Sequence, residues 1–398
     1  MQVVIMGLGY IGLPTAALIA SRKIRVHGVD INQHVVDTIN QGKIHIVEPD
    51  LDGLVHHGVQ QGFLIAAPQP KKADVFLVAV PTPFKEEHKP DTTYVEKATR
   101  MVVPFLKEGN LFILESTSPV GTTEKLASII FKERPALKGK IFIAYCPERV
   151  LPGSVIHELQ QNDRVIGGID EKSTEAAIAF YSKFVKGSLH KTNARTAEMC
   201  KLTENAYRDV NIAFANELSI ICDKAGINVN ELIELASKHP RVKILKPGPG
   251  VGGHCIAVDP WFIVSDFKEE ARIIRQARMT NNYKRDWVIE KIRNAAAAFK
   301  KKNKKQAVIA CMGLAYKPNI DDLRESPALE IVHELQRLKH KVIPVEPNVT
   351  KHGKLVLANA QEAVKHADII VFLVAHRAFE KISVQKDKLV LDFCGIAK

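Results

Sequence analysis

The residue whose type and surroundings most directly indicate chemistry is Cys255, which follows a run of glycines in the stretch PGPGVGGHCIAVDPW at residues 247–261. Glycines put little side-chain bulk beside the thiol and leave backbone N–H groups free, so a ligand can approach the sulfur closely. The alternative is a small side chain that only packs, which is a common role for an isolated cysteine. The rest of the chain must decide between a nucleophile and a packing residue.

The composition is that of a globular protein and argues against several classes. The 398 residues are 46% hydrophobic and 25% charged, which is enough for two or three domains with buried cores. The six cysteines include no CxxC pair and no Cys/His cluster at zinc spacing, so we expect no disulfide framework, no metal and a reduced cytoplasmic location. The strand-like start VVIMGLG is no signal peptide, and no apolar run reaches membrane-spanning length, so we expect no membrane contact.

The net charge of +12 leaves two kinds of partner open, namely acidic small ligands such as dinucleotides and nucleotide sugars, or nucleic acid. Part of the excess lies in the run KKKNKK at residues 300–305, which we interpret as a solvated linker. Aromatic residues are not interleaved with basic ones, as a surface that stacks on bases requires. We therefore expect an acidic small ligand and no nucleic acid.

The first residues have the pattern of a dinucleotide-binding turn. An apolar run at residues 3–6 predicts a strand, and the sequence GLGYIG at residues 7–12 connects it to a helical pattern. A second predicted strand at residues 24–29 ends on Asp30. The glycines let a pyrophosphate approach a helix N-terminus, and Asp30 can accept hydrogen bonds from ribose hydroxyls. Since Asp30 would repel a 2′-phosphate, the expected cofactor is NAD rather than NADP.

Polar residues follow the next predicted strands, at residues 75–80, 111–114 and 141–144. Ligands of open parallel sheets bind beyond the carboxyl ends of the strands, which makes Thr82, Thr117 and Glu148 candidates for contact with cofactor or substrate. The alternative for each threonine is a turn or a helix cap. Cys146 lies in the same region and is a rival thiol.

A long helical pattern without proline covers residues 196–225 and connects two halves of the chain. Its spacing places four polar residues on one face, namely Glu198, Lys201, Asn205 and Arg208. Such a face is usually only solvated, and a functional role requires that another element bring a substrate to it. Beyond residue 306, alternating strands and helices predict a second sheet, whose first turn lacks GxGxxG and so gives no support for a second dinucleotide.

These patterns predict an α/β protein of two Rossmann-like, doubly wound parallel-sheet domains joined by a long central helix. A series of separated motifs resembles the UDP-glucose/GDP-mannose dehydrogenases, NAD-dependent enzymes that oxidise the carbon 6 alcohol of a nucleotide sugar to a carboxylate. The motifs are GLGYIG, Asp30, VPTP, ESTSPVGTT, CPERVLPG, KLTEN, GPGVGGHCIAVDP and YKPNIDDLRESP. The resemblance implies an NAD-binding domain at residues 1–194, a central helical domain with the cysteine loop at 195–299, and a UDP-sugar-binding domain at 300–398.

Within the family, segments such as NDRVIGG and HPRVKILKPGPGVGGHCIAVDPWF are most similar to the members that act on UDP-N-acetyl-D-mannosamine. Such members supply an aminouronic acid for bacterial surface polysaccharides. Members that act on UDP-N-acetylglucosamine share several of these segments, so the epimer at carbon 2 stays open, and UDP-glucose is a further alternative.

The resemblance implies two successive hydride transfers to NAD⁺, with the intermediate aldehyde captured on Cys255 as a thiohemiacetal and then as a thioester. Lys201 would accept the proton of the alcohol or stabilise the oxyanion, and Asn205 would orient it. Asp259 and Thr117 would order or activate water. The base for hydrolysis of the thioester would be Glu148.

The resemblance also implies two sets of binding residues. The cofactor set is Gly7, Gly9, Tyr10, Ile11, Gly12, Asp30, Thr82, Thr117, Thr123 and Arg324. The substrate set is Arg149, Val150, Lys201, Asn205, Arg208, His239, Arg241, Gly252, Tyr316 and Lys317. In relatives the arginine at position 241 comes from the neighbouring subunit, so we expect a homodimer or a larger homo-oligomer.

Three features leave alternatives open. Instead of binding substrate, His239, which precedes a proline, could simply end a helix, and Arg241 could be a surface charge. The family commonly has a basic residue two positions after an aspartate in the last strand, whereas Asp392 is followed two positions later by Cys394. Two other functions compete with the two-step oxidation: a single-hydride dehydrogenase in which Cys255 only packs, and a non-catalytic protein that binds NAD or nucleic acid.

Overall fold

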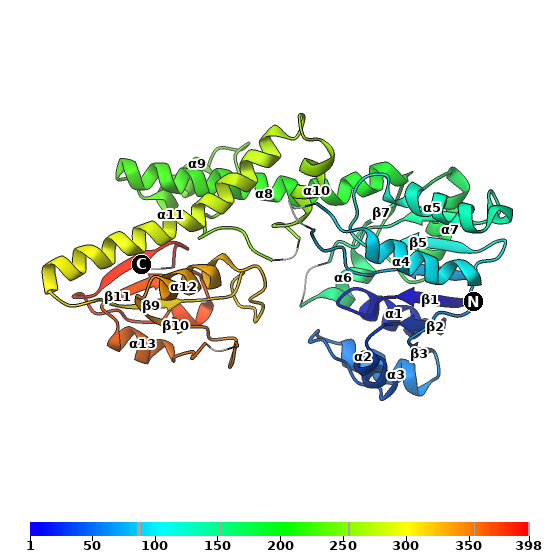
Figure 1. The fold of residues 1–398 in the computed structure, drawn as a ribbon, viewed down its shortest axis with the longest axis horizontal. Helices are drawn as coiled ribbons and strands as arrows, with labels where there is room; N and C mark the ends of the chain where they lie inside the picture. The colour runs from blue at the N-terminus through cyan, green and yellow to red at the C-terminus, as the bar shows by residue number, and fades with distance from the viewer. Residues whose placement is uncertain (86–88, 151–152, 254, 354, 397–398) are drawn as a thin grey trace. The chain divides into compact units, whose positions relative to one another are not determined.

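The computed structural model describes residues 1–85, 89–150, 153–253, 255–353 and 355–396. The chain divides into two compact units, Met1–Glu204 and Asn205–Lys398. The long helix α8 (Ala194–Ala225) runs through the boundary between them (Figure 1). Within the described ranges, no helix combines the length and the apolar character needed to span a membrane.

The first unit is built on an eight-stranded sheet with the strand order β3-β2-β1-β4-β5-β6-β7-β8. Its strands are β1 (Gln2–Met6), β2 (Arg25–Val29), β3 (Leu64–Ala67), β4 (Val75–Val78), β5 (Leu111–Leu114), β6 (Phe142–Tyr145), β7 (Arg164–Gly168) and β8 (Leu189–Asn193). Neighbouring strands are parallel except β6 and β7, which pair antiparallel. The order from β3 to β6 is that of a dinucleotide-binding fold. In this fold the chain adds strands to one side of β1 and then to the other, so the strand order reverses between β1 and β4.

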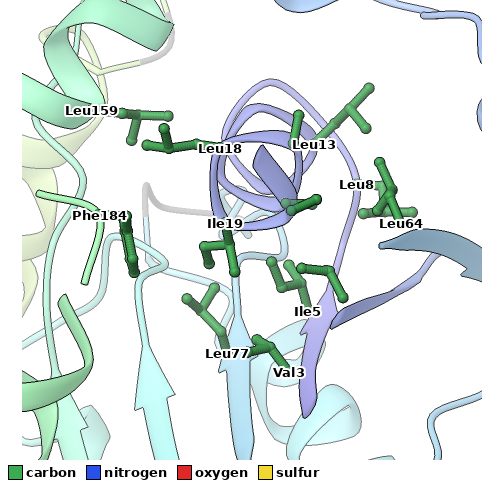
Figure 2. Packing of buried hydrophobic residues seen from close by; sticks show 14 of the residues in the cluster. Val3, Ile5, Leu8, Leu13, Leu18, Ile19, Leu64, Leu77, Leu159 and Phe184 are labelled. Atoms are coloured by element: carbon green, nitrogen blue, oxygen red, sulfur yellow. The ribbon is translucent and has the colours of Figure 1, made fainter. Parts of the chain in front are cut away.

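Helices cover both faces of this sheet, because its strands alternate between two buried clusters. Val3 and Ile5 of β1 pack into one cluster, and Val4 and Met6 into the other. Figure 2 shows part of the first cluster, in which Ile19 of α1 (Gly12–Ser21) lies toward Ile5 of β1 and Val3 lies toward Leu77 of β4. The helices of the unit are α1 (Gly12–Ser21), α2 (Gln33–Asn40), α3 (Leu51–Gln60), α4 (Thr93–Val102), α5 (Thr122–Glu133), α6 (Val155–Gln161) and α7 (Glu171–Tyr181).

The second unit contains a parallel four-stranded sheet with the order β10-β9-β11-β12. The strands are β9 (Val308–Met312), β10 (Lys341–Val345), β11 (Ile369–Phe372) and β12 (Leu389–Asp392). Besides the end of α8, its helices are α9 (Val229–Ala236), α10 (Asp259–Asp266), α11 (Arg272–Asn303), α12 (Pro327–Arg337) and α13 (Ala360–His366) (Figure 1). The sheet again separates two buried clusters. The predicted α/β fold of two Rossmann-like sheets with a long linking helix is therefore confirmed.

The predicted linker at residues 300–305 is wrong for most of its length. Helix α11 continues through Asn303, and its last turn holds Lys300, Lys301 and Lys302. Lysines near a helix C-terminus interact favourably with the partial negative charge of the last carbonyls, so a run of positive charge continues the helix here. The helix ends at Asn303, and the next residue, Lys304, has a left-handed φ of 55°. The division into three domains stays a prediction.

Candidate active site

The turn after β1 uses its glycines for two different reasons. Gly7 has a φ of +91°, and a Cβ there would lie 2.8 Å from the carbonyl oxygen of Ala79. At Gly12, the first residue of α1, a Cβ would lie 1.8 Å from the carbonyl oxygen of Gly7. A Cβ on Gly9, by contrast, would have no atom of the described residues within 4 Å, its two chain neighbours aside. The fold itself requires Gly7 and Gly12, while Gly9 leaves open the space that a ligand needs at the start of α1.

Asp30 lies at the end of β2 and is tied to this turn. Its Oδ2 accepts the backbone N–H of Leu8 at 3.0 Å, and its Oδ1 accepts that of Asn32 at 2.9 Å. A carboxylate oxygen has room for more than one hydrogen bond, and the side chain is only partly buried. With Tyr10 exposed and Ile11 half-buried next to Gly9, these residues fit the pyrophosphate and ribose of NAD.

The threonines at the strand ends have protein partners. The hydroxyl of Thr82 donates to the carbonyl oxygen of Thr117 at 2.7 Å, which ties the segment after β4 to the segment after β5. Thr123 is fully buried in the first turn of α5, and its hydroxyl donates to Glu198 Oε1 at 2.7 Å. Glu198 also accepts the N–H of Gly121 at 2.6 Å, and it thereby caps the N-terminus of α5. The structure thus brings Thr82 and Thr117 together and places Thr123 in a buried cap.

In the second unit, Cys255 lies next to a buried polar pair. The Cys255 side chain is exposed, and its carbonyl oxygen accepts the N–H of Asp259 at 2.8 Å, so the chain turns directly into α10. Asp259 is buried, and its Oδ2 accepts the amide of Asn205 from α8 at 2.5 Å. Lys201 is half-buried on the same helix, one turn before Asn205. A second element therefore does reach α8 at Asn205, and it carries the cysteine.

The glycines before Cys255 serve packing within the protein. A Cβ on Gly252 would lie 2.3 Å from the carbonyl oxygen of Glu325 and 2.8 Å from the Cβ of Tyr316. Gly253 has a φ of +82°, and a Cβ there would lie 2.8 Å from the ring of Tyr316. The space beside these glycines is thus filled by the segment after β9, which differs from the expectation that they leave room for a ligand.

That segment holds the remaining motif of the second unit. Tyr316 is half-buried, and its N–H donates to the carbonyl oxygen of Asp322 at 3.2 Å. The Arg324 guanidinium pairs with the Asp322 carboxylate at 2.6 Å, and both members keep part of their side-chain surface exposed. Lys317 is exposed between them in sequence. Since Gly252 packs on Tyr316, the structure joins the cysteine loop to this motif.

Three predicted substrate residues lie on the surface of the second unit. Arg208 is exposed on α8. His239 and Arg241 are exposed in the turn after α9, where His239 Nδ1 accepts the N–H of Arg241 at 3.3 Å. Within the second unit, none of these three has an ion-pair partner among the described residues, and their roles remain predictions.

The two candidate thiols differ in exposure. Cys146 is fully buried after β6, and burial raises the pKa of its thiol to about 12, although Arg164 opposes this shift. A thiol is a nucleophile only as the thiolate, so Cys146 is unreactive at neutral pH. Cys255 is the exposed thiol of the pair. No group of three or more His, Cys, Asp or Glu side chains in the described ranges is arranged to hold a metal ion.

Glu148 is a buried carboxylate with both oxygens engaged. Its Oε1 accepts the backbone N–H of Arg149 at 2.6 Å, and its Oε2 pairs with the Arg164 guanidinium at 2.9 Å. Arg149 in turn pairs with Glu204 at 2.9 Å, and Val150 packs against the core of the first unit.

Sequence reasoning missed two residues that hold this region. Buried Glu48 accepts the N–H groups of Gly153 and Val155 at 2.9 and 2.7 Å, which fixes the chain shortly after Val150. Arg164 is the other, and it pairs with Glu148. The sequence did carry a signal for both, because each is a charged residue next to apolar ones: Glu48 in IHIVEPDL and Arg164 in DRVIGG. A charge that is buried among apolar residues requires a partner.

Three family models match the chain in order. They describe the NAD binding domain, the central domain and the UDP binding domain of the UDP-glucose/GDP-mannose dehydrogenase family, at residues 1–185, 195–283 and 310–398.

Relatives of known name match nearly the whole chain. UDP-N-acetyl-D-mannosamine dehydrogenase of Escherichia coli is 56% identical over 95% of this chain and 94% of the relative. NDP-N-acetyl-D-galactosaminuronic acid dehydrogenase of Ralstonia nicotianae is 54% identical over 98% of this chain and 95% of the relative. Among solved structures, a UDP-D-ManNAc dehydrogenase from Pyrococcus horikoshii has a TM-score of 0.90 and 40% identity, covering 100% of this chain and 96% of that one. The chain therefore belongs to the UDP-glucose/GDP-mannose dehydrogenase family.

Proposed function

We propose that the chain is an NAD-dependent UDP-N-acetyl-D-mannosamine dehydrogenase that oxidises carbon 6 of the sugar to a carboxylate. The substrate is inferred from relatives bearing that name, which are 53–56% identical over nearly the whole chain. The match to an NAD binding domain supports NAD⁺ as the oxidant, and the match to a UDP binding domain supports a UDP-sugar as the substrate.

One observation carries the mechanism. Asn205 donates to buried Asp259 at 2.5 Å, and Asp259 begins the helix that directly follows exposed Cys255. This hydrogen bond ties Asn205 of α8 to the cysteine turn within the second unit. A cysteine that served only for packing would need neither exposure nor a buried amide–carboxylate pair beside it.

The first oxidation uses the residues of α8. Bound NAD, held at the turn of residues 7–12 and by Asp30, supplies an acceptor for the hydride from carbon 6 in each of the two oxidations. Lys201 accepts the proton of the carbon 6 hydroxyl or stabilises the negative charge on its oxygen, and Asn205 orients that oxygen. The product of this step is an aldehyde.

Cys255 then prevents the aldehyde from escaping. Its thiolate adds to the aldehyde carbon, and the carbonyl oxygen takes up a proton to give a thiohemiacetal. Loss of the second hydride and of that proton leaves a thioester. The family's motifs assign the ordering of a water molecule to Asp259 and Thr117 and the removal of its proton to Glu148. Attack by that water breaks the C–S bond and releases the carboxylate. The thiol of Cys255 is restored.

The remaining predicted residues are proposed to bind. Arg149, Val150, Arg208, His239, Arg241, Gly252, Tyr316 and Lys317 are assigned to the UDP-sugar, and Thr82, Thr123 and Arg324 to the cofactor. The proposed location is the cytoplasm, where the cysteines stay reduced.

The proposed oligomer is a homodimer or a larger homo-oligomer. Tyr207, Phe214 and Ile221 are exposed at intervals of seven residues on α8, which supports a second copy packing along that helix. Light scattering coupled to size-exclusion chromatography should give a mass of two or more chains. A mass of one chain at micromolar concentration would contradict it.

The experiment that tests the function is a product assay. Purified protein with NAD⁺ and UDP-N-acetyl-D-mannosamine should form about two NADH for each uronate. A single NADH and a released aldehyde would instead indicate a single-hydride dehydrogenase.

A second candidate substrate follows from the Ralstonia relative, which is 54% identical to this chain. The kcat/KM values for UDP-N-acetylmannosamine, UDP-N-acetylgalactosamine, UDP-N-acetylglucosamine and UDP-glucose should be ranked in parallel. We expect UDP-N-acetylmannosamine to rank first. A higher value for the galactosamine sugar would favour the second candidate, and equal values would defeat the assignment of the sugar.

A further inference from the structure

A buried cluster of ionisable side chains lies directly behind Glu148 in the first unit. Arg164 pairs with Glu148 at 2.9 Å and lies 3.8 Å from Glu115, and all three side chains are almost completely buried. The hydroxyl of Tyr181 donates to Glu115 Oε1 at 2.6 Å, and the Arg164 guanidinium lies over the Tyr181 ring at 5.0 Å. Arg164 also approaches the sulfur of Cys146 at 3.8 Å.

The antiparallel strand explains how this cluster forms. Glu115 follows β5, and Cys146 and Glu148 follow β6, so all three lie at the carboxyl edge of the parallel part of the sheet. Because β7 runs in the opposite direction to β6, its first residue, Arg164, lies at that same edge. Tyr181, the last residue of α7, closes the group from one face. A parallel β7 would have placed the arginine at the other edge.

The charges of the cluster do not balance when both carboxylates are ionised. Two carboxylates then share one guanidinium, and Oε2 of Glu115 has no hydrogen-bond partner among the residues that the structure describes. Burial raises the pKa of Glu115 to about 7; Arg164 and the Tyr181 hydroxyl oppose this shift, and the charge of Glu148 adds to it. Burial also holds the pKa of the Tyr181 hydroxyl and the Cys146 thiol far above neutrality, so neither is a competing charge. Near neutral pH, Glu115 is therefore the group that gains or loses a proton.

We propose that Arg164 is a positioning residue that holds Glu148 for hydrolysis of the thioester, and that the protonation of Glu115 sets how much of the Arg164 charge Glu148 receives. This inference rests on the proposed role of Glu148 as the hydrolytic base. When Glu115 is neutral, Glu148 is the only carboxylate that pairs with Arg164 in this cluster, and the pair stabilises the Glu148 carboxylate. When Glu115 is ionised, Arg164 is shared between the two carboxylates, and less of its charge opposes the transfer of a proton from water to Glu148.

The first test separates hydrolysis from the oxidations. In Arg164→Met, we expect a rapid burst of about two NADH per active site, followed by turnover at least tenfold slower than in the wild type. Mass spectrometry of the quenched reaction should find the sugar on the Cys255 peptide. Arg164→Lys, which keeps the charge, should restore part of the slow step. A parallel fall of every step with no burst would show a merely structural role and overturn the proposal.

The matched control is Arg278→Met. Arg278 pairs with Asp209 at 2.7 Å and is as deeply buried as Arg164, but it belongs to the second unit. The Arg278→Met variant should lower the melting temperature by about as much as Arg164→Met does, and it should show no burst of NADH. A burst in this variant too would mean that any lost buried pair slows hydrolysis, which would also overturn the proposal.

The second test uses Glu115→Gln, which keeps the shape and the acceptor for Tyr181 but cannot ionise. In the wild type, the decay rate of the covalent intermediate should rise with increasing pH, with an inflection near pH 7, and the variant should lose that inflection.

The pH dependence of stability gives a second readout. The wild-type free energy of unfolding should fall between about pH 4.5 and 7, because the folded state binds the extra proton, and the variant should lose that fall. An inflection that survives in the variant excludes Glu115.

These outcomes are distinguishable from a failure of the proposed function. If the wild type forms only one NADH per sugar, or if Cys255→Ala still makes uronate, there is no thioester and the function itself is wrong. If the wild type forms about two NADH and Cys255→Ala makes no uronate, a normal decay rate in Arg164→Met refutes the positioning role alone.

Discussion

The two Rossmann-like units build the same turn and use it differently. Gly7 and Gly313 each follow a first strand, have φ values of +91° and +93°, and donate to the end of the second strand, at Val29 and Val345, at 2.8 Å. In both, a carboxylate at the end of the second strand accepts N–H groups from the turn. The common geometry is a property of the fold and carries no information about the ligand.

The difference lies in what else each carboxylate contacts. Asp30 is partly exposed, and α1 starts at Gly12, directly after the turn. Glu346 is buried, accepts the N–H groups of Leu314 and Ala315 at 2.8 and 2.9 Å, and is closed off by His376.

The hydrogen bonds fix the tautomer of that histidine. The N–H of Asn319 donates to His376 Nδ1 at 2.9 Å, so His376 Nε2 carries a hydrogen and donates to Glu346 at 3.1 Å. The second turn thus satisfies its carboxylate from within the protein, whereas the first leaves acceptor capacity for a ribose.

The largest effect is expected at the first turn. Gly12→Ala should destabilise the first unit by more than about 3 kcal/mol and abolish NAD binding, because the overlap with the Gly7 carbonyl involves backbone that cannot move aside. The matched control is Gly9→Ala, which should keep the wild-type melting temperature and lose NAD affinity, since only a ligand occupies that space. A stable Gly12→Ala protein with normal NAD affinity would refute the description of the turn.

Removal of the charge at Asp30 should have the next largest effect, which is a loss of NAD affinity. Asp30→Asn should raise the Kd for NAD by about 10- to 100-fold, because hydrogen bonds to a charged acceptor contribute about 1.5–3 kcal/mol. Isothermal titration calorimetry measures this directly. Glu346→Gln is the paired variant and should leave the Kd for NAD within about twofold; equal losses in both variants would mean that the second turn also takes part in NAD binding.

The paired variant should instead change stability. Glu346→Gln should lower the free energy of unfolding by about 1–3 kcal/mol at pH 7. Burial opposes ionisation of Glu346, but hydrogen bonds from His376 and from backbone N–H groups outweigh it and hold its pKa below the ordinary value. The stabilisation is therefore present above the unfolded pKa of about 4.5 and is lost as pH falls through the lower folded pKa. Urea unfolding at pH 7 and pH 4 should show a smaller difference between the two proteins at pH 4.

The smallest effect on stability is expected at Arg324. Its pair with Asp322 is partly exposed, and such pairs contribute about 0–1 kcal/mol, so Arg324→Ala should melt within a few degrees of the wild type. If Arg324 serves the cofactor, the KM for NAD should rise while that for the UDP-sugar stays unchanged. The reverse pattern would assign Arg324 to the sugar.

The sequence predicted most of the fold because its strands are apolar and its turns are marked by glycine and proline. The pattern around residues 7–30 and the long helix ending at Ala225 were recognisable without a structure. The reversal of β7 was not predictable, since a short strand carries no mark of its direction. That reversal is what brings Arg164 to Glu148.

The candidate site was predicted less fully, and for a physical reason. Motifs identified Cys255, Asn205 and Asp259, but only the structure shows the hydrogen bond from Asn205 to Asp259. The glycines near Cys255 were expected to make room for a ligand, but Gly252 and Gly253 pack closely on Tyr316. Close packing selects glycine in the same way as access for a ligand. Sequence shows which positions lack a side chain but not what fills the space.

The most direct test of the account is a single-turnover reaction of the wild type and Cys255→Ala with NAD⁺ and UDP-N-acetyl-D-mannosamine. The account predicts about two NADH and one uronate per active site in the wild type, with the sugar transiently bound to the Cys255 peptide in quenched samples. The variant should form no uronate. Uronate formation by Cys255→Ala at the wild-type rate would contradict the central claim that this exposed thiol carries the substrate between the two oxidations.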